Sequence, residues 1–315
     1  MKVGTENFSG SDVNMEKLYK VSVRLIQPWK TVLWLLDAAL DFGTDLLARL
    51  LGSRLVRRHF HLLLSALVLF GPLLSFWVSR YNVFANSNHY VYRKFLRSTW
   101  GWTCVLTASF ILLRSLAARH PPSLTLRHLS RVAVVGLLWQ GGQRLLTLLE
   151  DAAGACYEPL SPQDAEGAAA AGQLPLLLHE DWTKASCLRA KLVWRGYDVS
   201  QDVLVLCLCC LLLVEELSVF HPHLGQVKPP HGSQGLPLRL VFLLCALLLA
   251  LWVFLLLCLL AHFPKFPAQQ LGGALGYLGW RGLYQGWYRF RSSWGCPGLP
   301  SDGLFTSADA NKEPR

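Results

Sequence analysis

The segment Pro237–Phe263 is a long apolar run in which Arg239 is the only Lys, Arg, Asp or Glu residue. A helix of about 20 apolar residues crosses the roughly 30 Å of hydrocarbon in a bilayer, so this run is long enough to span a membrane. Charged residues make up only 16% of the 315 residues, whereas a soluble domain has about a quarter. The chain is therefore predicted to be an integral membrane protein.

Further apolar runs predict an all-α, polytopic membrane helix bundle of about six spans. The weakest run, Pro267–Tyr288, is interrupted by glycines and by Arg281. Its glycines at about every fourth position suit close helix packing, although a re-entrant or interfacial helix is the alternative. The remaining predicted spans are Phe60–Ser79, Thr99–Ala117, Leu129–Leu149 and Val203–Phe220, and the glycines are Gly272, Gly276 and Gly279.

Basic residues gather before the first predicted span and between the second and third, whereas the connection from 150 to 200 is rich in Asp and Glu. The positive-inside rule then places both termini in the cytosol and this connection in a lumen. The net charge of +10 marks membrane orientation and not nucleic-acid binding, because no RNA- or DNA-binding motif is present. The predicted parts are a cytosolic N-terminal region with an amphipathic helix (1–59), a six-span domain (60–288) with a luminal loop (150–202), and a disordered cytosolic tail (289–315).

Lys30–Leu51 has the pattern of an amphipathic helix ahead of the first span. Leucines recur on one side, and Asp37, Asp41 and Asp45 recur every four residues beside them. Two interpretations stay open. The helix lies on the cytosolic leaflet, or it packs on the bundle with its Asp face in water.

Glu215 and Glu216 lie inside an apolar run, where acidic residues are rare and usually mark a site or a partner. If this span begins near Val203 at the luminal face, Glu215 lies about 18 Å into the membrane. Arg281 lies about as far along the sixth span, so an intramembrane charge pair of Glu215 or Glu216 with Arg281 is predicted. The alternative is that both glutamates reach water at the cytosolic boundary or are protonated.

Cys156 and Cys187 are the only cysteines in the predicted luminal loop. An oxidising lumen would favour a disulfide, but sequence does not show whether the geometry allows one, so free thiols remain the alternative. No GxSxG elbow, P-loop or HExxH motif is present. The histidines gather near the cytosolic boundary, where contact with anionic head groups is favoured over a metal. No metal and no cofactor is predicted.

Several segments from about His59 to Tyr288 together resemble, in order and spacing, the fat-storage-inducing transmembrane (FIT) family, most closely its type 1 sequences. The segments are STWGWTC (Ser98–Cys104), RHLSR (Arg127–Arg131), EDAAGACYEPL (Glu150–Leu160), WRGYDVS (Trp194–Ser200), VEE (Val214–Glu216), PLRLVFLLCALLLALWVFLLLC (Pro237–Cys258) and GWRGLYQGWY (Gly279–Tyr288). The resemblance implies an endoplasmic-reticulum protein with six spans and cytosolic termini. It also implies a role in forming lipid droplets through binding of triacylglycerol and diacylglycerol. No protein partner is indicated.

The resemblance further implies a likeness to lipid phosphatases, with luminal cleavage of fatty acyl-CoA by two histidines. This sequence departs from the family at both positions, which hold Asp202 and Pro264. Proline can neither attack phosphorus nor transfer a proton. His262 lies two residues early, about 200° around a helix, and would face away from the site unless Pro264 has ended that helix. Asp202 could attack phosphorus, but a helix N-terminal residue beside a Ser200 cap is the simpler interpretation.

Two functions follow from these departures. The first is a non-catalytic or strongly impaired membrane protein that binds or partitions neutral lipid. The second is a luminal acyl-CoA diphosphatase with an altered site that uses Asp202 or His262. A small-solute transporter is a weaker third alternative, since no internal repeat is present.

Overall fold

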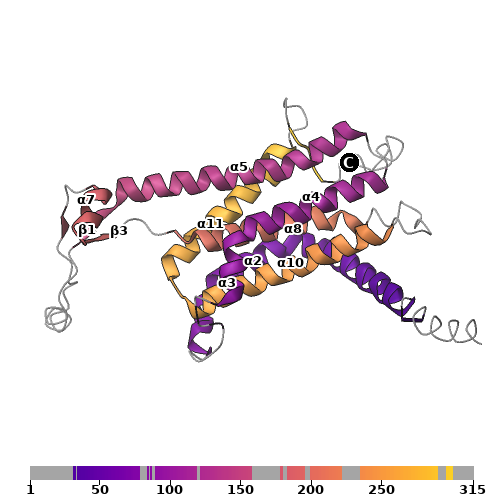
Figure 1. Cartoon of the computed structure of the whole chain (residues 1–315), viewed down its shortest axis with the longest axis horizontal. Coiled ribbons are helices and arrows are strands. Elements are labelled where there is room, and N and C mark those ends of the chain that lie inside the picture. The colour runs from indigo at the N-terminus through magenta and orange to yellow at the C-terminus, as the bar shows by residue number, and fades with distance from the viewer. Residues whose placement is uncertain are drawn as a thin grey trace, which may run out of the picture.

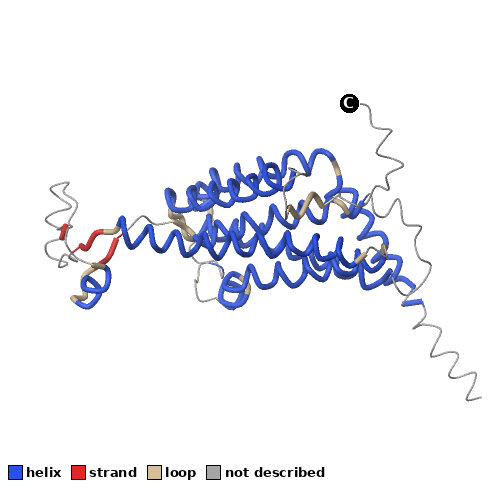
Figure 2. Tube along the Cα trace, turned by 90° about the horizontal axis from the view of Figure 1, so that it is seen from above, coloured by secondary structure: helices blue, strands red, loops and turns tan. Residues whose placement is uncertain are grey.

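The computed structural model describes residues 31–32, 34–78, 84, 86, 89–118, 121–157, 178–179, 183–195, 199–221, 235–289 and 296–300. Long helices lie side by side along one axis, and a small sheet lies beyond the bundle at the end of one helix (Figure 1). The view turned by 90° shows the same arrangement (Figure 2). The predicted all-α membrane fold is confirmed.

The helices follow the predicted apolar runs closely. Thr99–Ala117 is helical with the bounds expected from its sequence, and the other helices begin or end within a few residues of their runs. The helices are α2 (Arg54–Phe70), η1 (Gly71–Phe76), α3 (Tyr90–Lys94), η3 (Leu96–Ser98), α4 (Thr99–Ala117), α5 (Pro122–Ala153), α7 (Lys184–Arg189), α8 (Gln201–Ser218), α10 (Gly235–His262), α11 (Phe266–Trp280), the π-helical turn η4 (Arg281–Gly286) and η5 (Trp287–Arg289).

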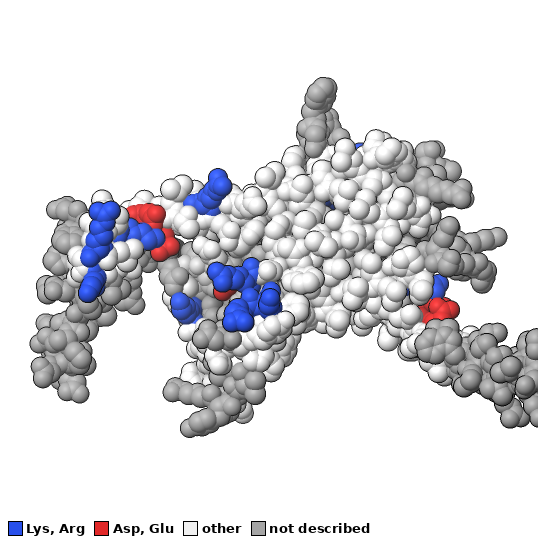
Figure 3. Space-filling model, viewed as in Figure 1, with Lys and Arg blue, Asp and Glu red and all other residues white. Residues whose placement is uncertain are grey.

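Four helical segments of the described chain are long and apolar enough to cross a membrane: Arg54–Phe76, Tyr90–Ala117, Pro122–Ala153 and Gly235–His262. The face of the bundle in Figure 3 is correspondingly a broad uncharged band, with Lys, Arg, Asp and Glu side chains toward its ends. Of the two other expected spans, α8 carries three carboxylates, and α11 has 15 residues before η4 and η5 continue it. The count of six spans stays a prediction.

Helix α8 forms the centre of the bundle and packs against α2, α4, α10 and α11. Ser200 caps it, because its Oγ accepts a hydrogen bond from the Val203 N–H (3.5 Å). Fifteen of its residues are buried, from Val203 to Ser218 with Glu215 as the half-buried exception. A Cβ added at Gly272 would lie 2.4 Å from the Ser200 carbonyl oxygen, and one at Gly276 would lie 2.9 Å from that of Leu204. The glycines therefore let the α11 backbone contact α8 directly, as predicted.

Residues 34–52, which precede α2, are helical. Thr44, Ala48 and Leu51 are buried against the bundle, and Arg239 on α10 pairs with Asp41. Trp34, Phe42, Leu36, Leu46 and Leu50 are exposed. The C-terminal part of the helix thus packs on the bundle, with Leu47 also in contact with the core, while several of its large apolar side chains stay uncovered. Each of the two interpretations therefore fits one part of the helix. Leu33 lies outside the described residues.

The connection after α5 contains a three-stranded antiparallel sheet in the order β2-β1-β3: β2 (Leu178–His179), β1 (Ala155–Tyr157) and β3 (Val193–Arg195). Cys156 on β1 and Cys187 on α7 form a disulfide with Cα atoms 5.8 Å apart. The Asp151 carboxylate accepts a hydrogen bond from Lys184 Nζ (2.6 Å), and this bond raises the pKa of the ammonium. The disulfide and the ion pair fasten the sheet and α7 to the end of α5.

Part of the expected disordered tail is ordered. Residues 296–300 pack on the bundle, with Cys296, Pro297 and Pro300 buried. The expectation of disorder does not hold for this segment, because its backbone carbonyls accept hydrogen bonds from arginines of α4 and α5. The remaining tail residues, 290–295 and 301–315, lie outside the described part of the chain.

Candidate functional site

The two positions that the resemblance assigns to histidines lie at the same end of the bundle. Asp202 is in the first turn of α8, and Pro264 is in the short turn between α10 and α11. The Ser200 N–H donates to the Ala268 carbonyl of α11 (3.0 Å), which fixes these two helix starts against each other. Lys265, next to Pro264, acts electrostatically on the Asp202 carboxylate.

Gln269 holds the turn that contains Pro264. Its buried side chain donates to the Phe263 carbonyl (2.9 Å) and accepts from the Lys265 N–H (3.2 Å), so it caps the end of one helix and the start of the next. Helix α10 ends at His262, which is half-buried. Position 264 therefore lies beyond the end of α10. The argument that a rotation of about 200° between positions 262 and 264 turns His262 away from the site requires both to be helical, so it does not apply.

The chemistry available at this end is limited by its side chains. Asp202 is exposed and has Lys265 as a neighbour, while Pro264 presents only a ring and a carbonyl. A carboxylate beside an ammonium can bind a polar group, and the two groups differ in chemistry from the imidazole pair that the resemblance assigns to this end. The described residues contain no group of three or more His, Cys, Asp or Glu that could hold a metal ion.

The opposite end of the bundle contains a buried ion pair. Arg131 on α5 donates from Nε to Glu216 Oε1 (2.8 Å) and from Nη2 to Oε2 (3.0 Å). The two side chains are 0% and 1% exposed. Tyr284 of η4 donates to Oε1 (3.1 Å), so Glu216 is bound by two helices other than its own. Bidentate arginine–carboxylate pairs are among the strong hydrogen bonds.

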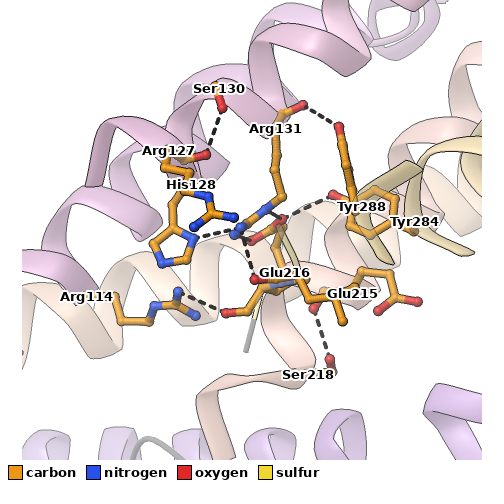
Figure 4. A network of polar contacts seen from close by, with 12 residues as sticks. Arg114, Arg127, His128, Ser130, Arg131, Glu215, Glu216, Ser218, Tyr284 and Tyr288 are labelled. Atoms are coloured by element: carbon orange, nitrogen blue, oxygen red, sulfur yellow. Dashed lines mark hydrogen bonds and ion pairs between the residues drawn. The ribbon is translucent and has the colours of Figure 1, made fainter. Parts of the chain in front are cut away.

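Further groups enclose Arg131 (Figure 4). His128 lies one turn earlier on α5, and its Nδ1 is 2.6 Å from Arg131 Nη1. The same Nη1 donates to the Leu299 carbonyl (3.3 Å), and Tyr288 Oη donates to the carbonyl of Arg131 (3.4 Å). The network therefore joins α5, α8, η4, η5 and the 296–300 segment.

The predicted partner of the glutamates is wrong. Arg281 is exposed and donates to Tyr277 Oη (3.0 Å) on its own helix, whereas Tyr284, one turn on, reaches Glu216. Equal depth in the membrane does not set the direction around the helix axis, and Arg281 faces away from α8. Glu215 points away from Arg131 in Figure 4, and Arg57 and Arg289 act on it electrostatically.

Sequence reasoning counted Arg131 among the basic residues that indicate orientation and in the RHLSR segment of the family resemblance, and did not place it in a site. A usable signal was present, because His128, Arg131 and Val135 follow the three- and four-residue spacing of one helix face. All three are buried in the structure. An arginine on the apolar face of a predicted span could have been matched to Glu216, since buried charges require partners.

Two cavities flank the contact between α8 and α11. The first, of about 290 Å³, lies toward α2 and is lined by residues that include His61, Val68, Leu211, Gln270 and Tyr277. The second, of about 260 Å³, lies toward α5 and is lined almost wholly by apolar residues: Leu138, Trp139, Gly142, Leu145, Leu146, Leu204, Leu208, Leu275, Gly276, Leu278 and Gly279. Leu145 and Leu278 are more than half exposed, so the second cavity opens on the outer surface of the bundle.

Comparison with known proteins gives a consistent result. Residues 80–234 match the family described as fat storage-inducing transmembrane protein (FIT). The chain is 58% identical over 280 residues to fat storage-inducing transmembrane protein 1 of Danio rerio, covering 88% of this chain and 95% of that protein. It is 42% identical over 284 residues to the Homo sapiens protein of the same name, covering 90% and 91%.

A second group of relatives has a different name. The chain is 32% identical over 208 residues to acyl-coenzyme A diphosphatase FITM2 of Mus musculus, covering 65% of this chain and 72% of that protein. No solved structure matches the chain.

Proposed function

Because the chain belongs to the fat storage-inducing transmembrane (FIT) family, we propose that it supports lipid droplet formation and fat storage in the membrane of the endoplasmic reticulum. It does so by binding or partitioning triacylglycerol and diacylglycerol, and it has little or no acyl-CoA diphosphatase activity. Both termini face the cytosol, and the sheet after α5 faces the lumen. Protease protection of tags at either terminus in sealed microsomes would contradict this orientation.

The replaced histidine positions carry the proposal. Asp202 and Pro264 stand at one end of the bundle, where α8 and α11 begin. The scaffold at this end is complete, since Ser200 caps α8 and Gln269 holds the turn. What this chain lacks at this end is therefore the two imidazole side chains, and not the backbone arrangement that would hold them. Loss of a nucleophile or of a general acid and base each lowers a rate by orders of magnitude.

The cavities beside α8 support the binding of neutral lipid. Their volumes of about 290 and 260 Å³ are at the small end of the roughly 300–1,000 Å³ range of ligand pockets. Each cavity fits part of an acyl chain, and neither fits a whole triacylglycerol. We infer that acyl chains enter from the bilayer while the remainder of the lipid stays in the membrane.

An acyl-CoA diphosphatase is the second candidate. It is favoured by the name of the FITM2 relatives and by one observation, that Asp202, Lys265 and His262 gather at one end of the bundle. In this alternative Asp202 or His262 would supply the nucleophile or the general acid and base that the two histidines supply in the resemblance.

An acyl-CoA cleavage assay separates the two candidates. The purified chain, its Asp202→His/Pro264→His variant and a FITM2 relative are incubated with oleoyl-CoA, and released products are measured. We expect cleavage by the relative and none above background by the unmodified chain. Cleavage by the unmodified chain that Asp202→Asn or His262→Ala abolishes would establish the second candidate and contradict the first. Gained activity in the double variant would show that the scaffold has kept its geometry.

Lipid binding is tested by filling the second cavity. Gly142 lines this cavity, and a side chain added there meets nothing within 4 Å. We expect Gly142→Leu to lower binding of labelled triacylglycerol in detergent several-fold, because it occupies the space of an acyl chain. Gly141→Leu is the matched control, since Gly141 is also open but does not line the cavity. Equal binding by both variants would remove the cavity from the proposal.

A further inference from the structure

Three arginines converge where α4 ends and α5 begins. Arg114 is in the last turn of α4, and Arg127 and Arg131 lie near the start of α5. We call these residues the arginine cluster. Each donates to a backbone carbonyl of the 296–300 segment, as Arg114 Nη2 to Pro300 (3.4 Å), Arg127 Nε to Cys296 (3.1 Å) and Arg131 Nη1 to Leu299 (3.3 Å).

The arginine cluster has more positive charge than the buried carboxylates of the described chain neutralise. Arg114 and Arg131 are 2% and 0% exposed, and Glu216, at 1%, is the one carboxylate buried with them in the described chain. Glu216 binds both Nε and Nη2 of Arg131. Among the described residues, two buried guanidiniums and one buried carboxylate leave one positive charge without a buried counter-ion. A buried charge without a counter-ion is strongly unfavourable.

Arg114 also has an unused donor. Its Nη1 is fully buried and makes no hydrogen bond, and an unmade bond at a buried polar group costs about 1–3 kcal/mol. The carbonyl of Pro300 is a neutral acceptor of the other nitrogen, at a long 3.4 Å. A charged acceptor would form roughly twofold stronger hydrogen bonds than such a carbonyl.

The position of the cluster indicates the source of this acceptor. Arg114 lies near the end of the candidate span Tyr90–Ala117, and Arg127 and Arg131 near the start of Pro122–Ala153. The ends of spans lie at the level of lipid head groups. After Glu216 has neutralised Arg131, Arg114 and Arg127 contribute two charges. A phosphate monoester carries about −1.5 to −2, whereas a phosphodiester carries about −1, so the monoester is the better match.

We propose that the arginine cluster binds the phosphate monoester of an anionic lipid, with phosphatidic acid as the simplest example, and that residues 296–300 are an exchangeable cover over this site. The Arg114 and Arg127 guanidiniums hold the phosphate from two helices. The phosphate displaces the carbonyls of Pro300 and Cys296, and it reaches Arg114 Nη1 only after the cover has moved. This site is separate from the Asp202 end and from both cavities, and it does not depend on binding of neutral lipid.

The test measures lipid binding to the full chain in nanodiscs by native mass spectrometry, with phosphatidic acid or phosphatidylglycerol added to phosphatidylcholine. We expect phosphatidic acid to bind at least about tenfold more tightly than phosphatidylglycerol, because the diester has less negative charge and one free phosphate oxygen fewer to accept bonds from the two guanidiniums. A chain that ends at residue 295 lacks the cover and should bind phosphatidic acid several-fold more tightly than the full chain. Equal affinity with and without the cover would contradict its role as a competitor.

Substitutions are made in the chain that ends at 295, because there they change the lipid contact and not the cover. Arg127→Gln and Arg114→Gln should each weaken binding of phosphatidic acid about tenfold, and Arg114→Lys should weaken it less because the charge remains. Arg144→Gln is the matched control, since Arg144 is exposed near the other end of α5. Arg127 is exposed, so its variant tests the site even if the Arg114 variants fail to fold.

Inorganic phosphate is added as a competitor to distinguish the two sources of the anion. Competition only at far higher concentration than the lipid identifies a membrane lipid as the ligand. Competition at a concentration equal to that of the lipid supports the phosphate site but identifies a soluble phosphate, and not a membrane lipid, as its ligand. If Arg114→Gln and Arg127→Gln bind phosphatidic acid as Arg144→Gln does, the proposal is overturned.

Discussion

Helix α8 carries carboxylates at both of its ends, and the two ends have opposite environments. At its C-terminal end Glu216 is buried and is bound by Arg131 of α5 and Tyr284 of η4. At its N-terminal end Asp202 is exposed in the first turn of a capped helix. The same chemical group is a structural anchor at one end and a surface residue at the other. The role of an acid in a membrane bundle is thus set by its partners.

The largest loss of stability is expected when the buried ion pair at the C-terminal end of α8 is broken. Glu216→Leu leaves the Arg131 guanidinium buried without its counter-ion, which costs about 3–5 kcal/mol when one partner of a buried pair is removed. The free energy of unfolding, measured by steric trapping in bilayers, should fall by this amount. Arg49→Leu is the control, because it breaks an exposed pair with Asp45 (2.8 Å) worth about 0.3–0.5 kcal/mol.

The double variant Arg131→Met/Glu216→Leu sharpens this result. It removes both charges, so most of the stability lost in the single variant should return. A double variant as unstable as Glu216→Leu would show that the stability comes from the shape of the side chains and not from the pairing of their charges.

The next effect concerns the scaffold of the Asp202 end. Gly272→Ala places a Cβ 2.4 Å from the Ser200 carbonyl oxygen, and such overpacking costs about 1–3 kcal/mol. Gly282→Ala is the control, since nothing lies within 4 Å of a Cβ there, and it should stabilise the helix by up to about 1 kcal/mol. Thermal unfolding in detergent compares the two. Equal stability of both variants would mean that α8 and α11 are not in backbone contact.

A smaller effect is expected at Asp202. Asp202→Asn removes a negative charge from a helix N-terminus, which is worth about 0.3–1 kcal/mol. The same unfolding measurement should show a loss of that size. A loss near that of Glu216→Leu would mean that Asp202 is also held by buried partners, and the contrast between the two ends of α8 would fail.

The smallest effect is expected at Arg281. Arg281→Gln removes an exposed charge whose hydrogen bond goes to Tyr277 on its own helix, so stability should change by no more than about 0.5 kcal/mol. The charge exchange Glu216→Arg/Arg281→Glu should be as unstable as Glu216→Arg alone. Rescue by this exchange would restore Arg281 as the partner of Glu216.

Much of the fold was predictable because a membrane span is defined by the length and hydropathy of a continuous stretch of sequence. Length and hydropathy gave the bounds of α4 and placed those of α10 within two residues, whereas α5 begins at Pro122, seven residues before the predicted start. The glycines of α11 predicted a close contact because a missing side chain is itself a geometric signal. The ordered 296–300 segment was not predictable from its composition, since its order depends on arginines far away in the chain.

The site was predictable in part, for a related reason. Sequence identified the acids of α8 and predicted their depth, but depth is one coordinate, and a partner must also match in direction around the helix. Arg281 was matched on predicted depth alone, while Arg131 has the direction that the ion pair requires. The cap at Ser200 was predictable because capping is local. The neighbourhood of Asp202 and Lys265 needed the fold, because it joins the starts of two helices.

The separation of 85 residues between Arg131 and Glu216 has a consequence for biogenesis. Three carboxylates make α8 insert less readily alone than an uncharged helix, because an acid is costly within a span, up to about 2.5–3.5 kcal/mol at its centre on insertion scales. The ribosome produces α5 well before α8, so the counter-ion is already in the bilayer when Glu216 arrives. We expect α8 to enter the membrane by docking on an earlier helix, and the order of synthesis then becomes part of how this bundle is assembled.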